Sequence, residues 1–145
     1  MTESSIVGVW RLVSYESRSE SGATRLPYGE RVSGYLIYTP EGYMSVTIMG
    51  ANRPNLASED RLAGTPDEYA RAMKTYVSYC GRYTVHPDRV VHHIELSHFP
   101  NWCGADQERF YQLEGDRLRL RTPPFELGGV QQTAHLVLER VHAIE

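Results

Sequence analysis

Residues 107–122 read QERFYQLEGDRLRLRT, two runs of alternating polarity on either side of a Gly115-Asp116 turn. A two-residue turn of this kind joins neighbouring antiparallel strands and places Leu113 opposite Leu118. Leu118 and Leu120 must then face inward, because the three arginines beside them cannot all be buried. Side chains alternate across a strand, so the same inner face carries three polar residues, Gln107, Arg109 and Tyr111. The hairpin therefore predicts an antiparallel sheet with an arginine pointing into its interior.

Six further stretches have the same alternation and are rich in valine, isoleucine, tyrosine and leucine, which is typical of β-strands. Short turns such as Thr39-Pro40-Glu41-Gly42 and His86-Pro87-Asp88 separate them, and Gly128-Gly129 has the composition of another hairpin turn. Together with the first hairpin, we expect strands over residues 9–17, 32–38, 43–49, 79–85, 90–97, 107–113, 118–122 and 131–141. Strands in hairpin order predict an all-β, up-and-down antiparallel barrel of eight to ten strands, with an open sandwich as the alternative.

One segment has the pattern of a helix. A Thr-x-x-Glu capping box begins at Thr65, and Pro66 suits the first helical position. An apolar stripe follows at helical spacing, formed by Tyr69, Met73 and Tyr76. We expect one short helix from Pro66 to about Tyr76, across or beside one end of the barrel. The loop before it, residues 50–64, is long enough to predict that it flanks a pocket.

Composition excludes several classes of protein. The chain has 145 residues, of which 41% are hydrophobic and 23% charged, which indicates a single domain over residues 1–145. A net charge of -3 without a basic block argues against nucleic-acid binding. The sequence contains neither an export signal nor an apolar run of about 20 residues, so a cytoplasmic protein without a membrane partner is predicted. Cys80 and Cys103 are expected to be reduced thiols.

The inward phase of two more strands follows from the turn at residues 86–89. This turn places Val85 opposite Val90 and Tyr83 opposite His92. The apolar face of the second strand comprises Val90, Ile94 and Leu96, and His92 falls on it. In the last strand the inward set is Gln132, Ala134, Leu136, Leu138 and Arg140. The interior is then predicted to combine apolar walls with a polar patch of Tyr79, Tyr83, His92, Gln107, Arg109 and Tyr111.

The polar patch has two interpretations. Buried polar groups need partners, so Arg109, His92 and the tyrosines can form a structural network within the core. Set among apolar walls, the same groups can instead orient one oxygen-bearing group of a small apolar molecule, with Trp102 as a lid. They can also polarise a carbonyl, with Arg109 or a tyrosine such as Tyr83 stabilising an enolate and His92 acting as the base.

Metal and cofactor binding are not predicted. His92 and His93 are adjacent in a strand and point to opposite faces, so they cannot chelate one ion together. No glycine-rich phosphate loop occurs, so no nucleotide cofactor is implied.

The chain also resembles a known family. Gly8-Val9-Trp10 is similar to the Gly-x-Trp that opens the first strand of lipocalins, and Arg140 supplies an arginine to pack over the tryptophan. Longer blocks are similar to the bacterial and fungal lipocalin-like domain family, namely residues 34–45, 79–83, 92–95, 99–102, 107–110 and 115–120. The resemblance runs from about residue 6 to 141. It implies a calyx-shaped barrel with a small-molecule cavity, in a group that includes carriers and cofactor-free cyclases or isomerases.

Three functional hypotheses follow. The first is a barrel that binds a small, largely hydrophobic, oxygen-bearing organic molecule through Tyr79, Tyr83, His92, Trp102, Gln107, Arg109 and Tyr111. The second is a cofactor-independent isomerase or cyclase of small-molecule metabolism in the same cavity, with His92, Arg109 and Tyr83 as catalytic residues. The third, an interaction module, is disfavoured because the outward residues form no apolar stripe. The expected partner is a small-molecule ligand or substrate, and both a monomer and a homodimer remain open.

Overall fold

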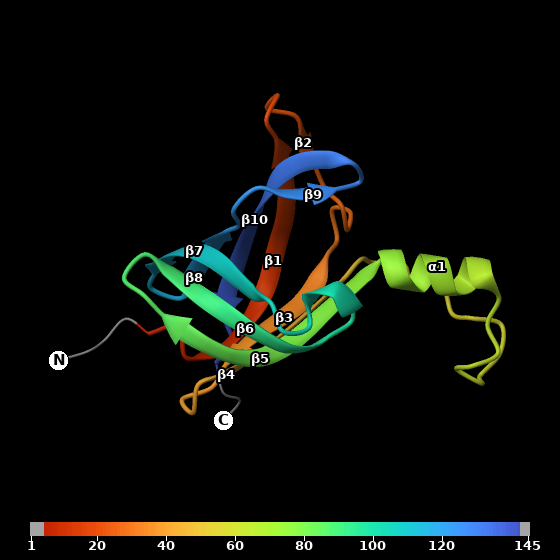
Figure 1. Ribbon diagram of the computed structural model, residues 1–145, viewed down its shortest axis with the longest axis horizontal. Helices are drawn as coiled ribbons and strands as arrows, with labels where there is room; N and C mark the ends of the chain where they lie inside the picture. Colours follow the sequence, from red (N-terminus) through yellow and green to blue (C-terminus); the bar gives the residue numbers. More distant parts are fainter. Residues whose placement is uncertain (1–4, 143–145) are drawn as a thin grey trace.

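The computed structural model describes residues 5–142 as a closed antiparallel β-barrel (Figure 1). Ten strands form one sheet, and eight of them close into the barrel because the first pairs with the last. In spatial order the barrel strands are β1 (Gly8–Ser19), β3 (Ser33–Tyr38), β4 (Tyr43–Met49), β5 (Tyr76–Val85), β6 (Arg89–Ser97), β7 (Asp106–Glu114), β8 (Arg117–Arg121) and β10 (Val130–Arg140). This order follows the chain, so the predicted up-and-down barrel is confirmed and the open sandwich is wrong.

The observed strand bounds lie within three residues of those expected from the sequence. Two strands were not expected, β2 (Thr24–Arg25) and β9 (Phe125–Leu127), because neither is long enough to show an alternating pattern. β2 pairs with the end of β1, and β9 pairs with the start of β10. The turn between β9 and β10 is Gly128-Gly129, with φ angles of 63° and 81° that favour glycine, as the sequence predicted.

The two ends of the barrel differ. At the hairpin end, tight turns at residues 39–42, 86–88 and 115–116 join neighbouring strands. At the loop end, the longer connections leave the barrel, among them the segment between β6 and β7 that contains the 3₁₀ turn η1 (Pro100–Trp102). The apolar core begins at the hairpin end, where Trp10, Leu118 and Leu138 are fully buried.

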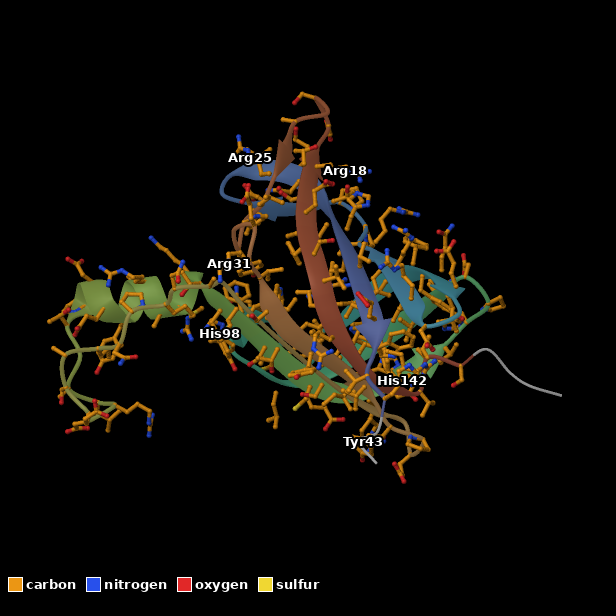
Figure 2. The ribbon with its side chains drawn as sticks, turned by 180° about the vertical axis from the view of Figure 1, so that it is seen from behind. Arg18, Arg25, Arg31, Tyr43, His98 and His142 are labelled. Carbon is orange, nitrogen blue, oxygen red and sulfur yellow. The ribbon has the colours of Figure 1, made fainter. Side chains whose placement is uncertain are left out.

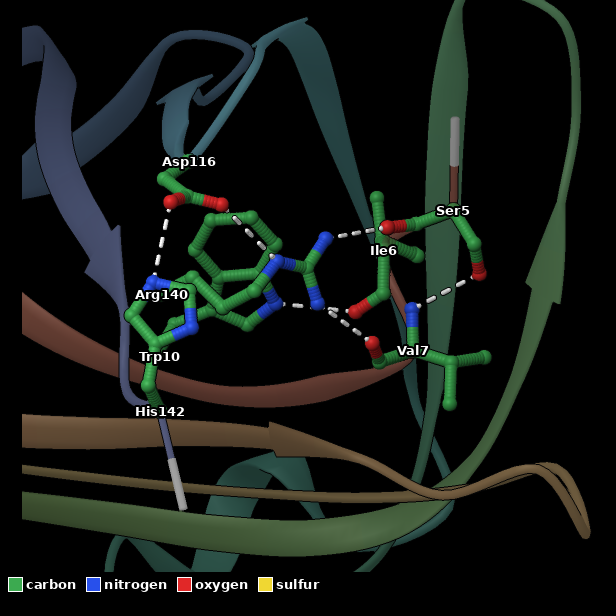
Figure 3. Close-up of polar contacts among 7 residues, drawn as sticks. All are labelled: Ser5, Ile6, Val7, Trp10, Asp116, Arg140 and His142. Atoms are coloured by element: carbon green, nitrogen blue, oxygen red, sulfur yellow. Dashed lines mark hydrogen bonds and ion pairs between the residues drawn. The ribbon is translucent and has the colours of Figure 1, made fainter. Parts of the chain in front are cut away.

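Trp10 and Arg140 lock the hairpin end (Figure 3). The guanidinium carbon of Arg140 lies 4.3 Å from the centroid of the Trp10 ring, which confirms the expected stacking. Arg140 also donates hydrogen bonds of 2.8 Å to the carbonyl oxygens of Ser5 and Val7. Asp116, in the β7–β8 turn, lies 3.6 Å from the Arg140 Nε atom. The start of β1 is thereby tied to the end of β10.

A segment that we call the arm, residues 50–75, extends clear of the barrel from the loop end in both views (Figures 1 and 2). It carries α1 (Pro66–Lys74), which has the predicted capping box and buries none of its residues. The helix ends before Tyr76 because that residue pairs with Met49 in the sheet. As predicted, the loop flanks a pocket, of about 350 Å³, but this pocket lies between the loop and α1, outside the barrel.

A β-bulge in β6 makes the predicted inward phase wrong for the residues after Ile94. Gly81 pairs with Ile94 while Cys80 pairs with Leu96, so Glu95 is an extra residue. Ile94 is buried as predicted, but Leu96, predicted to face inward, is 68% exposed. A Cβ atom on Gly81 would overlap the carbonyl oxygen of His93, so the bulge requires glycine at this position.

Candidate functional site

His92 on β6 is almost completely buried inside the barrel, as its predicted phase required. Its Nε2 atom lies 2.7 Å from the hydroxyl oxygen of Tyr38, and its Nδ1 atom lies 2.7 Å from that of Tyr79. Burial lowers the pKa of His92 well below its usual value, and the nearby Arg109 guanidinium lowers it further. The ring is therefore neutral at pH 7, with one nitrogen donating a hydrogen bond and the other accepting one.

The deeper burial of Tyr38 than of Tyr79 favours one direction for these hydrogen bonds. Tyr38 is 1% exposed, and within residues 5–142 its hydroxyl has no hydrogen-bond partner other than His92. If Nε2 carried the proton, the Tyr38 hydroxyl proton would be buried without an acceptor, at a cost of about 1–3 kcal/mol. The arrangement in which Tyr38 donates to Nε2 and Nδ1 donates to Tyr79 avoids this cost, because it leaves the unpaired proton on Tyr79, which is 7% exposed and lies beside Arg109 and Trp102. The Tyr79 hydroxyl proton is left free for an acceptor outside this Tyr38–His92–Tyr79 chain.

Arg109 on β7 brings a positive charge to the same inner face. It stands opposite Val90, which is fully buried, so the register points Arg109 into the barrel. Its guanidinium donates to the Gln107 side-chain oxygen at 2.6 Å and to the Glu108 carbonyl at 2.8 Å. Among the described residues Arg109 forms no ion pair with a carboxylate. Pairing of β7 with β8 starts only at Phe110, so Arg109 lies toward the loop end.

Tyr15 on β1 belongs to the same interior. A bulge at Val13 shifts the register of β1, and Tyr15 then stands opposite the inward-facing Leu136. Burial raises the pKa of Tyr15, Tyr28 adds to the rise, and the Arg109 guanidinium opposes it. The rings of Tyr15 and Tyr28 pack edge to face with centroids 5.0 Å apart.

Sequence reasoning missed Tyr38 and Tyr15. In the strand that contains Tyr38, Tyr35 and Ile37 on the outer face are as apolar as Leu36 and Tyr38 on the inner face, so polarity does not reveal the phase. Pairing across the turn at residues 39–42 was the signal that could have assigned Tyr38. Tyr15 lies beyond a bulge, and strict alternation places residues on the wrong face there.

The seven predicted ligand residues separate into two groups. Toward the loop end, Trp102 packs edge-on against Tyr79 with ring centroids 5.8 Å apart, and His92 bonds to Tyr79. Gln107 stands opposite His92 in the sheet and binds Arg109. Toward the hairpin end, the hydroxyls of Tyr83 and Tyr111 donate to the carbonyl oxygens of Thr39 and His86 respectively. Those two hydroxyls are bound to turns, so Tyr83 adjoins the Tyr38–His92–Tyr79 chain through ring packing on Tyr38 and as the cross-strand partner of His92, and not through its hydroxyl.

The inner face toward the loop end remains partly accessible. Tyr15, Gln107 and Arg109 all face inward by register, yet each is only half-buried. Half-burial of three inward-facing side chains means that the loop end of the interior is not sealed. Ser17 lies on the same face, and its buried hydroxyl has no hydrogen-bond partner within the described part of the chain. The arrangement offers hydrogen-bond donors from several strands to a molecule that enters the barrel.

Residues 5–142 show few other features of a site. No three histidine, cysteine or acidic side chains gather there in a way that could hold a metal ion. Cys80 and Cys103 are free thiols. A second pocket, of about 280 Å³, lies on the outer face of β4–β6 beside Leu96. No helix in this range is both long and apolar enough to cross a membrane.

Comparison with known proteins places the chain in a family. A family model described as a lipocalin-like domain matches residues 7–141. The chain belongs to the lipocalin-like domain family. This lipocalin-like chain is 37% identical over 108 residues to the 4'-hydroxy-3'-methoxypropiophenone carrier protein of Aspergillus oryzae, an alignment that covers 68% of the chain and 96% of that relative. No solved structure matches it significantly.

Proposed function

We propose that this lipocalin-like protein binds and carries a small, largely hydrophobic molecule whose acceptor oxygen is held inside the barrel. The observation that carries the proposal is the convergence of Tyr15, Tyr79 and Arg109, from three different strands, on one half-open inner face. Such a small set of polar groups among apolar walls is typical of sites that orient small ligands. The carrier role named for the Aspergillus oryzae relative supports the same function.

The walls around these donors suit an aromatic ligand. Several partly buried side chains pack against the core, among them Tyr28, Trp102 and Phe125. Aromatic rings favour edge-to-face contacts with one another, and Tyr79 already makes such a contact with Trp102. An aryl ketone would place its ring among these side chains and its oxygen toward Arg109 and Tyr79.

Calorimetric titration with 4'-hydroxy-3'-methoxypropiophenone tests the proposal. Replacing Arg109 by Met removes a charge-assisted hydrogen bond, so we expect affinity to fall by roughly 1.5–3 kcal/mol, or about 10- to 150-fold. Arg119→Met is the matched control, because Arg119 faces outward and pairs with Glu114. Equal affinity in wild type and Arg109→Met would contradict a site inside the barrel.

A second candidate function is a cofactor-free isomerase or cyclase. The observation that favours it is the Tyr38–His92–Tyr79 chain, because Tyr79, held by the neutral His92, can donate a hydrogen bond to a ligand carbonyl and stabilise the enolate formed when solvent water removes the neighbouring hydrogen. An enzyme of this kind would speed exchange of the hydrogens next to the ketone in heavy water, and Tyr79→Phe would slow that exchange by about 10²-fold. Exchange at the uncatalysed rate would contradict the enzyme hypothesis, and only the carrier function would remain.

A further inference from the structure

We infer that the interior site selects ligands with an acidic hydroxyl, such as a phenol or an enol, and binds them as the oxyanion against Arg109 and Tyr79. This inference rests on the proposed function, because it requires a ligand inside the barrel. It goes beyond that function by naming the charge state in which the ligand is held.

The first argument is the polarity of the site. Tyr79 accepts from His92 and has only its proton to offer, and a guanidinium has donors but no acceptor. The one amide oxygen beside Arg109, that of Gln107, is already taken at 2.6 Å. The Tyr15 hydroxyl has no hydrogen-bond partner among residues 5–142. A ligand oxygen that only accepts can bind Arg109 and Tyr79 together, whereas a neutral hydroxyl held there must also donate, for which the Tyr15 and Ser17 hydroxyls are the acceptors without a partner in this part of the chain.

The second argument is charge. Arg109 is half-buried and has no carboxylate partner within the described part of the chain, so its charge is uncompensated. The titratable groups on which the Arg109 charge acts are Tyr15, Tyr38, Tyr79 and His92, while Tyr28 lies against Tyr15 and Tyr111 lies near Tyr38. Burial raises the pKa of Tyr15, Tyr38 and Tyr79 and lowers that of His92. These four groups are thus neutral from about pH 7 to pH 9, and a ligand oxyanion would supply the missing negative charge.

Binding should then depend on pH in a defined direction. If the anion binds more tightly, the pKa of the bound phenol is lower than that of the free phenol. Affinity rises with pH by up to tenfold per unit between these two values and is flat outside them. A methyl ether of the same compound cannot ionise and shows no such rise.

The experiment follows the absorbance of 4'-hydroxy-3'-methoxypropiophenone with pH, free and in the presence of excess protein, because the phenolate absorbs at longer wavelength than the phenol. Binding of 3',4'-dimethoxypropiophenone, its methyl ether, is measured over the same range. We expect the bound phenol to ionise at least one pH unit below the free phenol, equivalent to tenfold tighter binding of the anion. Arg109→Met should abolish the shift, Arg109→Lys should retain it, and His93→Gln, which alters an outward-facing histidine, should leave it unchanged.

The outcomes separate the two proposals. Binding with an unshifted or raised phenol pKa overturns the oxyanion inference and leaves the carrier function standing. Retention of the shift in Arg109→Met overturns the assignment to Arg109. If neither the phenol nor its ether binds the wild-type protein, the proposed function and the inference fail together. The wild-type titration alone decides the matter if Arg109→Met does not fold.

Discussion

Burial of His92 couples the stability of the barrel to pH. Its pKa in the folded protein lies well below the unfolded value of about 6.5, so below that pH the unfolded chain binds a proton that the folded chain does not. The contribution of neutral His92 to the free energy of unfolding should be fully present above about pH 6.5. Below that pH it should fall, by at most about 1.4 kcal/mol per pH unit. Urea unfolding between pH 5 and 8 measures the slope of the free energy of unfolding against pH.

The control for this prediction is His92→Gln, which removes the titrating group and keeps a donor and an acceptor. Its slope should be shallower than that of wild type. Some slope should remain, because burial also lowers the pKa values of His98 and His135. Identical slopes in the two proteins would mean that His92 is not held neutral by the fold.

Trp10 is the second residue with a measurable effect on stability. It is completely buried and covered by Arg140, so Trp10→Ala should lower the free energy of unfolding by about 3–5 kcal/mol. Trp102→Ala, at the partly exposed loop end, should lower it by less. Denaturant unfolding checks both, and a loss below about 1 kcal/mol for Trp10→Ala would show that Trp10 is peripheral.

Residues next to tight turns were the easiest to predict. The Gly115-Asp116 turn sets the phase of Arg109, and the turn at residues 86–88 sets that of His92, because a turn fixes which residues face each other. The partner of His92 could not be found in this way. Tyr38 lies in a strand that is apolar on both faces, and only the closed barrel brings its hydroxyl to His92.

At the scale of strands, the bulge in β6 separates two apolar residues that the sequence predicted on the same inner face. Ile94 is 2% exposed and Leu96 is 68% exposed. Ile94→Ala should therefore destabilise the protein by about 2–5 kcal/mol, and Leu96→Ala by less than about 0.5 kcal/mol. Thermal or urea unfolding of the two variants measures the difference. Equal losses would mean that Leu96 faces inward after all and that the bulge is not present in solution.

Bulges and very short strands limit how well strands and their inward-facing residues can be predicted from a sequence. A bulge depends on the partner strand, so the alternation around Glu95 gives no sign of it. β2 and β9 have two and three residues, fewer than an alternating pattern needs. The helix was predictable because its signal is local: Thr65 and Glu68 make the capping box within one turn.

At the scale of the whole molecule, the arm should be separable from the barrel. Its ends meet where the Gly50 amide donates to the Thr75 carbonyl at 3.0 Å, and α1 buries no residue. Replacing residues 51–74 by a short glycine-rich turn should therefore change the free energy of unfolding by less than about 1 kcal/mol. Ligand affinity should be retained if the site is inside the barrel. Loss of binding with an intact fold would assign the site to the arm pocket instead.

Closure of the barrel by β1 and β10 has a consequence for synthesis of the protein. Arg140 binds the carbonyl oxygen of Val7, which lies 133 positions earlier in the sequence. One side of β1 therefore stays unpaired until β10 has been translated. A chain still on the ribosome has two unpaired sheet edges, β1 and its newest strand, and such edges favour association between nascent chains. Tyr15 stands on β1 opposite β10, so the complete inner face forms only after the final strand has emerged.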